Sequence, residues 1–143
     1  MDSISPSIAA PSILIVEDDV ELRETIVRTL LQAGFEAVAA SSGEDALDLI
    51  AAAEFDGLYC AIELPGRADG WEVGTTFSFI WPDRPVVYAS AISAPPGPLR
   101  KGAFLRKPFA VVMLTRAFGP ALPKPENLSP TRIKPANGFV HLS

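Results

Sequence analysis

Three parts of the chain supply side chains that could handle a phosphoryl group or a divalent cation. Three acids stand together at Glu17, Asp18 and Asp19, a hydroxyl lies at Ser90, and a lysine lies at Lys107. Adjacent carboxylates repel one another unless a cation compensates their charge, and oxygen ligands suit Mg²⁺. The plainer interpretation of the acids is a helix N-terminus, where negative charge is favourable.

The hydroxyl and the lysine have equally plain alternatives when each is taken alone. Ser90 could donate a hydrogen bond to a phosphoryl oxygen, although a serine after a strand is usually a turn residue. Lys107 precedes Pro108, which holds it extended and could aim its ammonium across the ends of neighbouring strands. Together with the acids they form a metal and phosphoryl site that lacks only a nucleophile. The position for that nucleophile is Ala61.

Short apolar runs alternating with helical patterns predict the elements that position these residues. Such alternation is typical of an α/β fold, a doubly wound five-stranded parallel sheet with helices on both faces. In this arrangement working residues gather at the carboxyl ends of the strands. The strands are expected at 13–16, 37–40, 57–62, 86–89 and 103–106. The helices are expected at 20–32, 41–53, 70–80 and 110–118, the third being weak because of Gly74, Thr75 and Thr76.

The crossover between the fourth and fifth strands is unusually rich in helix breakers. Pro95, Pro96, Gly97 and Pro98 stand together in its middle. A crossover with its helix needs about 10–12 residues, and these leave room for about one turn. The fourth helix is therefore expected to be missing or vestigial.

Composition excludes several classes of protein. The chain has 143 residues, 48% of them hydrophobic, and a formal net charge of -5, which argues against nucleic acid and anionic membranes as partners. The single cysteine, Cys60, and the lack of a signal peptide or membrane helix indicate a soluble cytoplasmic domain. We expect a flexible leader over 1–12, one domain over 13–118, and a proline-rich tail over 119–143 that is extended or disordered.

Four motifs in this order resemble the receiver domain of bacterial two-component response regulators, the CheY-like family. They are Ile-Val-Glu-Asp-Asp (15–19), Leu-Pro-Gly…Asp-Gly-Trp-Glu (64–72), Pro-Val-Val-Tyr-Ala-Ser-Ala (85–91) and Phe-Leu-Arg-Lys-Pro-Phe (104–109). The resemblance implies a flavodoxin-like fold with strand order 2-1-3-4-5. It also implies a non-enzymatic phosphorelay component whose partner is a histidine kinase or a histidine phosphotransfer protein.

The resemblance further implies a role for each residue of the site. Mg²⁺ would be held by two acids and a main-chain carbonyl, and a hydroxyl, a lysine and a switch aromatic would respond to the phosphoryl group. These positions are Glu17, Asp18 and the Glu63 carbonyl for the metal, then Ser90, Lys107 and Phe104. The family's phosphoacceptor aspartate falls on Ala61.

Ala61 changes what the site can do. A methyl group is neither a nucleophile nor a ligand, so this chain should be non-phosphorylatable and its Mg²⁺ affinity weakened. Glu63 is a poor substitute acceptor because its side chain starts two residues further along. Either Ala61 is a laboratory substitution in an ordinary receiver, or the chain is a natural pseudo-receiver, a phosphorylation-independent binding module.

A haloacid-dehalogenase-type phosphohydrolase is disfavoured because it needs aspartates two residues apart, the first as nucleophile, and here Glu17 precedes Asp19.

The residues after Phe118 are too few for an output domain, so a single-domain receiver acting by protein contact is expected. The cognate kinase, the oligomeric state and the output surface are not specified by the sequence.

Overall fold

The computed structural model describes residues 6–8, 10–98, 103–122 and 133–135. Its core is a five-stranded sheet in the order β3-β2-β4-β5-β6, with every neighbouring pair parallel. These strands are β2 (Ser12–Val16), β3 (Glu36–Ala40), β4 (Gly57–Ala61), β5 (Val86–Ser90) and β6 (Ala103–Arg106). They are the first to fifth strands expected from the sequence, so the predicted doubly wound fold and its strand order 2-1-3-4-5 are confirmed.

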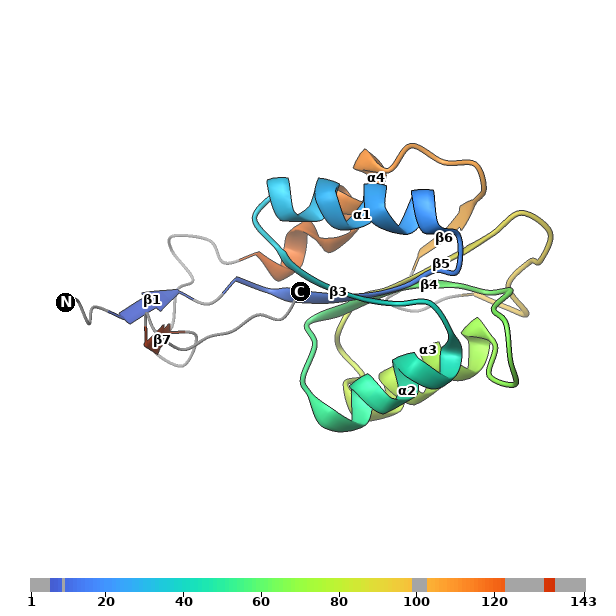
Figure 1. Ribbon diagram of the computed structural model, residues 1–143, viewed down its shortest axis with the longest axis horizontal. Helices are drawn as coiled ribbons and strands as arrows, with labels where there is room; N and C mark the ends of the chain where they lie inside the picture. Colours follow the sequence, from blue (N-terminus) through green and yellow to red (C-terminus); the bar gives the residue numbers. More distant parts are fainter. Residues whose placement is uncertain (1–5, 9, 99–102, 123–132, 136–143) are drawn as a thin grey trace.

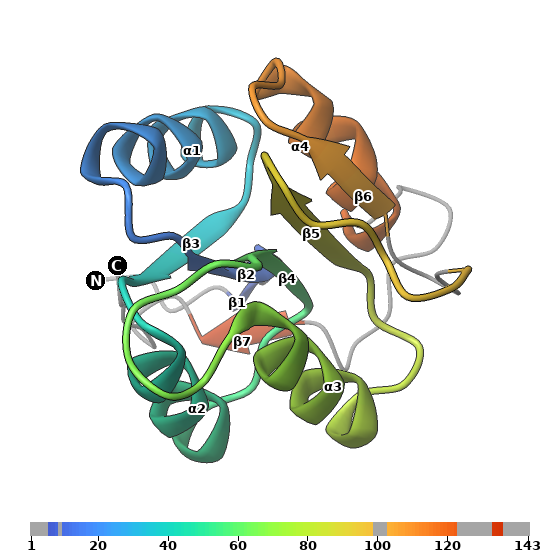
Figure 2. The same cartoon turned by 90° about the vertical axis from the view of Figure 1, so that its right-hand side faces the viewer.

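Four α-helices cover the two faces of the sheet. α1 (Val20–Gln32) and α4 (Val112–Phe118) lie on one face, and α2 (Gly43–Ala52) and α3 (Gly70–Ile80) lie on the other, as Figure 1 shows. Figure 2 looks along the strands onto the edge of the sheet where they end. This is the edge at which a site was expected.

Side-chain caps start three of these helices at the positions where the sequence places polar residues. Asp19, Ser42 and Asp69 each accept a hydrogen bond from the backbone N–H three residues further on, at 3.0, 3.1 and 3.0 Å. Such caps satisfy N–H groups that have no partner within the helix. Asp19 thus has the ordinary role of an acid at a helix start.

The core has two layers, one on each side of the sheet. Successive residues of a strand point to opposite faces, and β4 is buried along its whole length. Leu58 and Cys60 therefore pack with the layer under α2 and α3, whereas Tyr59 packs with the layer under α1 and α4. The orientation of Tyr59 matters for the site below.

Gly74 explains why α3 forms despite its weak helix formers. A Cβ at this position would overlap the hydroxyl oxygen of Tyr88 on β5. The glycine thus lets the helix pack directly on the tyrosine ring, which also contacts Trp71 at a centroid distance of 4.6 Å. Packing on the sheet, rather than intrinsic propensity, stabilises this helix.

The fourth crossover has no helix in its described part. Residues 91–98 are bends and irregular backbone, and 99–102 lie outside the described residues. This agrees with the expectation that the fourth helix is missing or vestigial.

Short segments from the two ends of the chain pair beside the domain. β1 (Pro6–Ile8) and β7 (Ile133–Pro135) form an antiparallel pair, visible in Figure 1 beyond the amino ends of the main strands. A 3-10 turn, Gly119–Ala121, follows α4. Within the described ranges, no helix is long and apolar enough to cross a membrane.

Candidate functional site

The predicted site residues meet at the carboxyl edge of the sheet. Glu17 follows β2, Ala61 ends β4, Ser90 ends β5 and Lys107 directly follows β6. The strand register pairs Val16 with Cys60, so Glu17 lies level with Ala61 on the neighbouring strand. The topology therefore brings together four residues that span 90 positions of sequence.

Glu17 is the centre of a buried polar network. Its side chain is fully buried, and its Oε1 accepts a hydrogen bond from the Tyr59 hydroxyl at 2.7 Å. The Lys107 ammonium lies 3.0 Å from Oε1 and 3.1 Å from Oε2. The backbone N–H of Asp19 donates to Oε2 at 3.2 Å. The carboxylate is therefore satisfied and neutralised by groups of the chain itself.

Tyr59 is the member of this network that the sequence did not indicate. It lies two residues before Ala61 on the same face of β4, and it is fully buried. Burial, with the adjacent negative charge and hydrogen bond of Glu17, raises the pKa of its hydroxyl well above the ordinary value. The group is thus held as a neutral donor. The sequence does contain one signal for this role, a tyrosine in a central strand. A buried tyrosine usually finds a hydrogen-bond partner for its hydroxyl.

The Lys107 side chain extends across the strand ends toward Glu17, the direction that its position before Pro108 suggested. Its backbone N–H donates to the carbonyl of Ser90 at 3.0 Å, which continues the pairing of β6 with β5. The Lys107–Pro108 peptide bond is cis. A cavity of ≈ 270 Å³ beside the lysine is lined by Leu22, Ala91, Lys107, Pro108 and Phe109. The lysine therefore has Glu17 on one side and an apolar cavity on the other.

Ser90 is engaged by a different carboxylate, that of Glu63. The Ser90 hydroxyl lies 2.9 Å from both Oε1 and Oε2 of Glu63, and the Ser93 hydroxyl also donates to Oε2. Burial alone would raise the pKa of Glu63, but the hydrogen bonds from Ser93 and Ser90 outweigh it and lower the pKa below its ordinary value. The side chain of Glu63 thus joins the loop after β4 to the loop after β5.

The start of the fourth crossover is fixed by further contacts around Ser90. The Ser90 oxygen accepts hydrogen bonds from the N–H groups of Ile92 and Ser93 at 3.0 and 2.7 Å. Arg106 donates to the carbonyls of Ser90 and Ser93 at 3.2 and 2.8 Å. These contacts stabilise a crossover segment that has no helix of its own in its described part.

Phe104 lies on the α2/α3 side of the sheet. It is partly buried, its ring is stacked on Trp71 at a centroid distance of 6.5 Å, and the Arg106 guanidinium lies 5.1 Å from its ring centroid. The predicted aromatic switch residue is therefore separated by the sheet from the Tyr59 layer.

The donor set for a metal ion is poor. Ala61 supplies only a methyl group and is fully buried, while Asp18 is exposed to solvent. In the described part of the chain, no group of three or more His, Cys, Asp and Glu side chains could hold a metal ion. Mg²⁺ needs near-octahedral oxygen ligands, and the carboxylates of Glu17 and Glu63 are already engaged by other groups of the chain. The residues present do not fit this ion.

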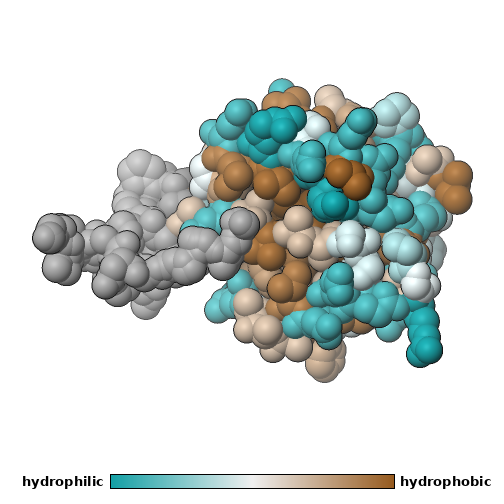
Figure 3. All heavy atoms as spheres, viewed as in Figure 1, coloured by the Kyte–Doolittle hydropathy of each residue, from teal (hydrophilic) through white to brown (hydrophobic). Residues whose placement is uncertain are grey.

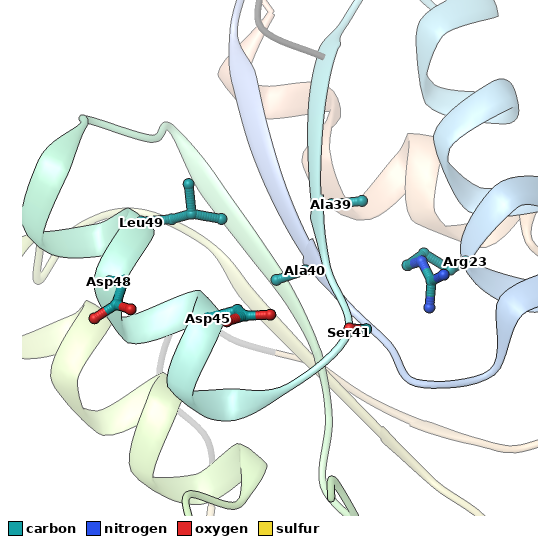
Figure 4. A pocket seen from close by; sticks show the side chains of 7 residues that line it. All are labelled: Arg23, Ala39, Ala40, Ser41, Asp45, Asp48 and Leu49. Atoms are coloured by element: carbon teal, nitrogen blue, oxygen red, sulfur yellow. The ribbon is translucent and has the colours of Figure 1, made fainter.

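A separate hollow lies beside the edge strand β3. Figure 4 shows this cavity of ≈ 470 Å³, whose lining side chains come from α1, from β3 and the residue after it, and from α2. Its lining residues are Arg23, Ala39, Ala40, Ser41, Asp45, Asp48 and Leu49. Figure 3 shows apolar residues at the surface on this side of the molecule, with polar residues above and below them. This hollow contains none of the predicted site residues.

The fold is a doubly wound α/β domain with a polar site at its strand ends, and comparison with known proteins identifies the family. The chain belongs to the response regulator receiver domain family, whose sequence pattern matches residues 13–118. Receiver domains are generally non-enzymatic modules that interact with histidine kinases or phosphotransfer proteins. The match favours the receiver over the phosphohydrolase.

Curated relatives are longer than this chain. The response regulator protein FleR of Pseudomonas aeruginosa is 33% identical over 138 residues, which cover 90% of this chain and 29% of FleR. The response regulator MprA of Mycolicibacterium vanbaalenii is 36% identical over 104 residues, covering 69% of this chain and 45% of MprA. The chain thus spans less than half the length of these relatives.

Solved structures agree with the fold. A response regulator receiver protein from Sinorhizobium medicae is 31% identical with a TM-score of 0.73, covering 78% of this chain and 93% of that one. The response regulator TrrA from Thermotoga maritima, in complex with Mg²⁺ and BeF, is 26% identical with a TM-score of 0.67, covering 78% of this chain and 99% of that one.

Proposed function

We propose that this chain acts in two-component signalling as a receiver that contacts a histidine kinase or a histidine phosphotransfer protein without accepting a phosphoryl group at residue 61. In this proposal Ala61 stands at the phosphoacceptor position. Ser90 and Lys107 correspond to the hydroxyl and the lysine that bind the phosphoryl group in relatives, and Phe104 corresponds to the switch aromatic.

One observation carries the proposal: the residue at the end of the central strand is a fully buried alanine. A methyl group cannot attack phosphorus. The groups that would receive a phosphoryl group also have other partners, because Lys107 is paired with Glu17 and Ser90 with Glu63. The site is thus set in one arrangement that does not depend on phosphorylation, and this supports a binding role in the unphosphorylated state.

Incubation with phosphorylated histidine kinase and phosphotransfer domains tests the proposal. We expect intact-mass spectrometry to find no added phosphoryl group, and calorimetry to find at least one such domain that binds equally well whether or not it is phosphorylated. Transfer of one phosphoryl group to the folded chain would refute the first part. Absence of binding by every such domain, or binding only by the phosphorylated form of the domain, would refute the second.

A further inference from the structure

We infer that the strand-end site of this chain is closed to Mg²⁺, and that Tyr59 closes it together with Lys107. This inference deepens the proposed function and rests on it. It rests on one observation: the Tyr59 hydroxyl and the Lys107 ammonium both contact the buried carboxylate of Glu17, which lies level with Ala61.

The Tyr59 side chain reaches well beyond the level of its own backbone. Its backbone pairs with Ile15, yet its hydroxyl bonds the carboxylate of Glu17, two residues further along the chain and just past the end of β2. Two residues of strand span about 6.6 Å, so the phenol extends along the sheet to the level of residue 61. Tyr59, Ala61 and Glu17 are all fully buried. The phenol therefore lies on the face of β4 that a longer side chain at position 61 would share.

The negative charge of Glu17 is already balanced by groups of the chain. A buried carboxylate is costly unless it is paired and hydrogen-bonded. Here an ammonium and a phenol meet that need, and both oxygens of the carboxylate are engaged. A Mg²⁺ ion would have to displace at least one of these partners, and the displaced ammonium would stay close enough to repel it. The chain thus supplies the positive charge that a cation would otherwise provide.

The other side chains near the site are poorly suited to bind Mg²⁺. The Glu63 side chain is committed to Ser90 and Ser93, Asp18 is exposed, and residue 61 has no oxygen beyond its backbone. Restoring a carboxylate at residue 61 alone would crowd it against Tyr59. Tight Mg²⁺ binding therefore requires changes at both positions 59 and 61, whereas a carboxylate at position 61 alone gives weak binding.

The test is a Mg²⁺ titration of four proteins without any phosphoryl donor: the unaltered chain, Ala61→Asp, Tyr59→Ile and the double variant. Isothermal calorimetry measures binding, and the thermal midpoint is compared in MgCl₂ and in EDTA at equal ionic strength. We expect no saturable binding by the unaltered chain or by Tyr59→Ile, weak binding by Ala61→Asp, and binding at least about tenfold tighter by the double variant.

Two controls make the outcome specific. Tyr88→Phe with Ala61→Asp removes the chain's other tyrosine and should behave as Ala61→Asp alone. If the isoleucine double variant does not fold, Tyr59→Phe with Ala61→Asp replaces it; this change removes the hydroxyl that bonds Glu17 but keeps the ring, so it should bind Mg²⁺ more tightly than Ala61→Asp alone, by a smaller factor. The inference is overturned if the unaltered chain binds Mg²⁺ saturably, or if Ala61→Asp alone binds as tightly as the double variant. Neither result depends on phosphoryl transfer, so the proposed function is judged by its own experiment.

Discussion

The ammonium nitrogen of Lys107 lies 3.0 Å from Oε1 of Glu17 and joins the end of β6 to the end of β2. The lysine side chain is 22% exposed, whereas the glutamate side chain is fully buried. The pair is therefore asymmetric. Loss of the lysine leaves a buried charge with the Tyr59 hydroxyl as its main side-chain partner, and loss of the glutamate leaves a lysine that can turn toward water.

This asymmetry predicts the effect of Lys107→Met. The substitution should destabilise the folded chain by about 1–3 kcal/mol, since a buried acceptor loses a charged partner that was itself partly screened by water. Urea unfolding measures the change. Arg28→Met, which removes an exposed cation of α1, is the matched control and should shift stability by less than about 0.5 kcal/mol. Equal stabilities of the two variants would contradict the pairing.

A second prediction concerns Ala61→Asp in the absence of metal. A second carboxylate beside Glu17 adds like-charge repulsion, and its volume conflicts with Tyr59, so the variant should be less stable by about 1–3 kcal/mol. Thermal melts in EDTA measure this difference. Ala61→Asn has the same shape without the charge and should cost less. A higher melting midpoint for the aspartate variant than for the alanine chain would show the prediction to be wrong.

A third prediction concerns Glu63 and pH. The pKa of Glu63 lies below its ordinary value of 4.5, so the folded state favours the ionised form. Its contribution to stability is present above pH 4.5 and is lost as pH falls through the lowered folded-state pKa. The unaltered chain should exceed Glu63→Gln in stability by less than about 1 kcal/mol near pH 7, because the group is largely exposed, and by less near pH 3.

Urea melts of both proteins across this range measure the pH effect. Glu24→Gln, a change at an exposed position of α1, is the matched control for the loss of one acidic side chain. A Glu63→Gln difference that stays constant from pH 7 to pH 3 would argue against the bonds to Ser90 and Ser93.

A fourth prediction concerns the ionisation of the two tyrosines. Burial raises the pKa of Tyr88 to about 12, and burial together with Glu17 raises that of Tyr59 further. The folded chain should therefore show no phenolate absorbance at 295 nm near pH 10, the ordinary value. Glu17→Gln should lower the Tyr59 pKa. One tyrosine titrating near pH 10 in the folded state would mean that the Tyr59 hydroxyl is not held as described.

Much of the fold could be predicted from local signals. Helix α1 begins after Asp19 and α3 spans Gly70–Ile80, both as expected, because cap residues and the apolar stripe lie close together in sequence. The gathering of Glu17, Ser90 and Lys107 followed from parallel topology alone. The position of Ala61 followed from the strand pattern and the family resemblance.

The partners within the site could not be predicted in the same way. Tyr59 meets Glu17 across 42 positions and Glu63 meets Ser93 across 30, contacts that depend on side-chain reach and rotamer rather than on periodicity. The same holds for Lys107, whose observed partner is Glu17, whereas the sequence pointed to a phosphoryl oxygen. These contacts engage the polar side chains at the strand ends around Ala61, which itself has no carboxylate.

We propose that this receiver does not take up a phosphoryl group at its strand-end site. The most direct test is intact-mass spectrometry of the folded chain after incubation with acetyl phosphate and Mg²⁺, with Ala61→Asp and its Tyr59→Ile double variant alongside. We expect no added mass for the unaltered chain and the largest base-labile, hydroxylamine-sensitive gain for the double variant. Addition of one phosphoryl group to the unaltered chain would contradict the proposal.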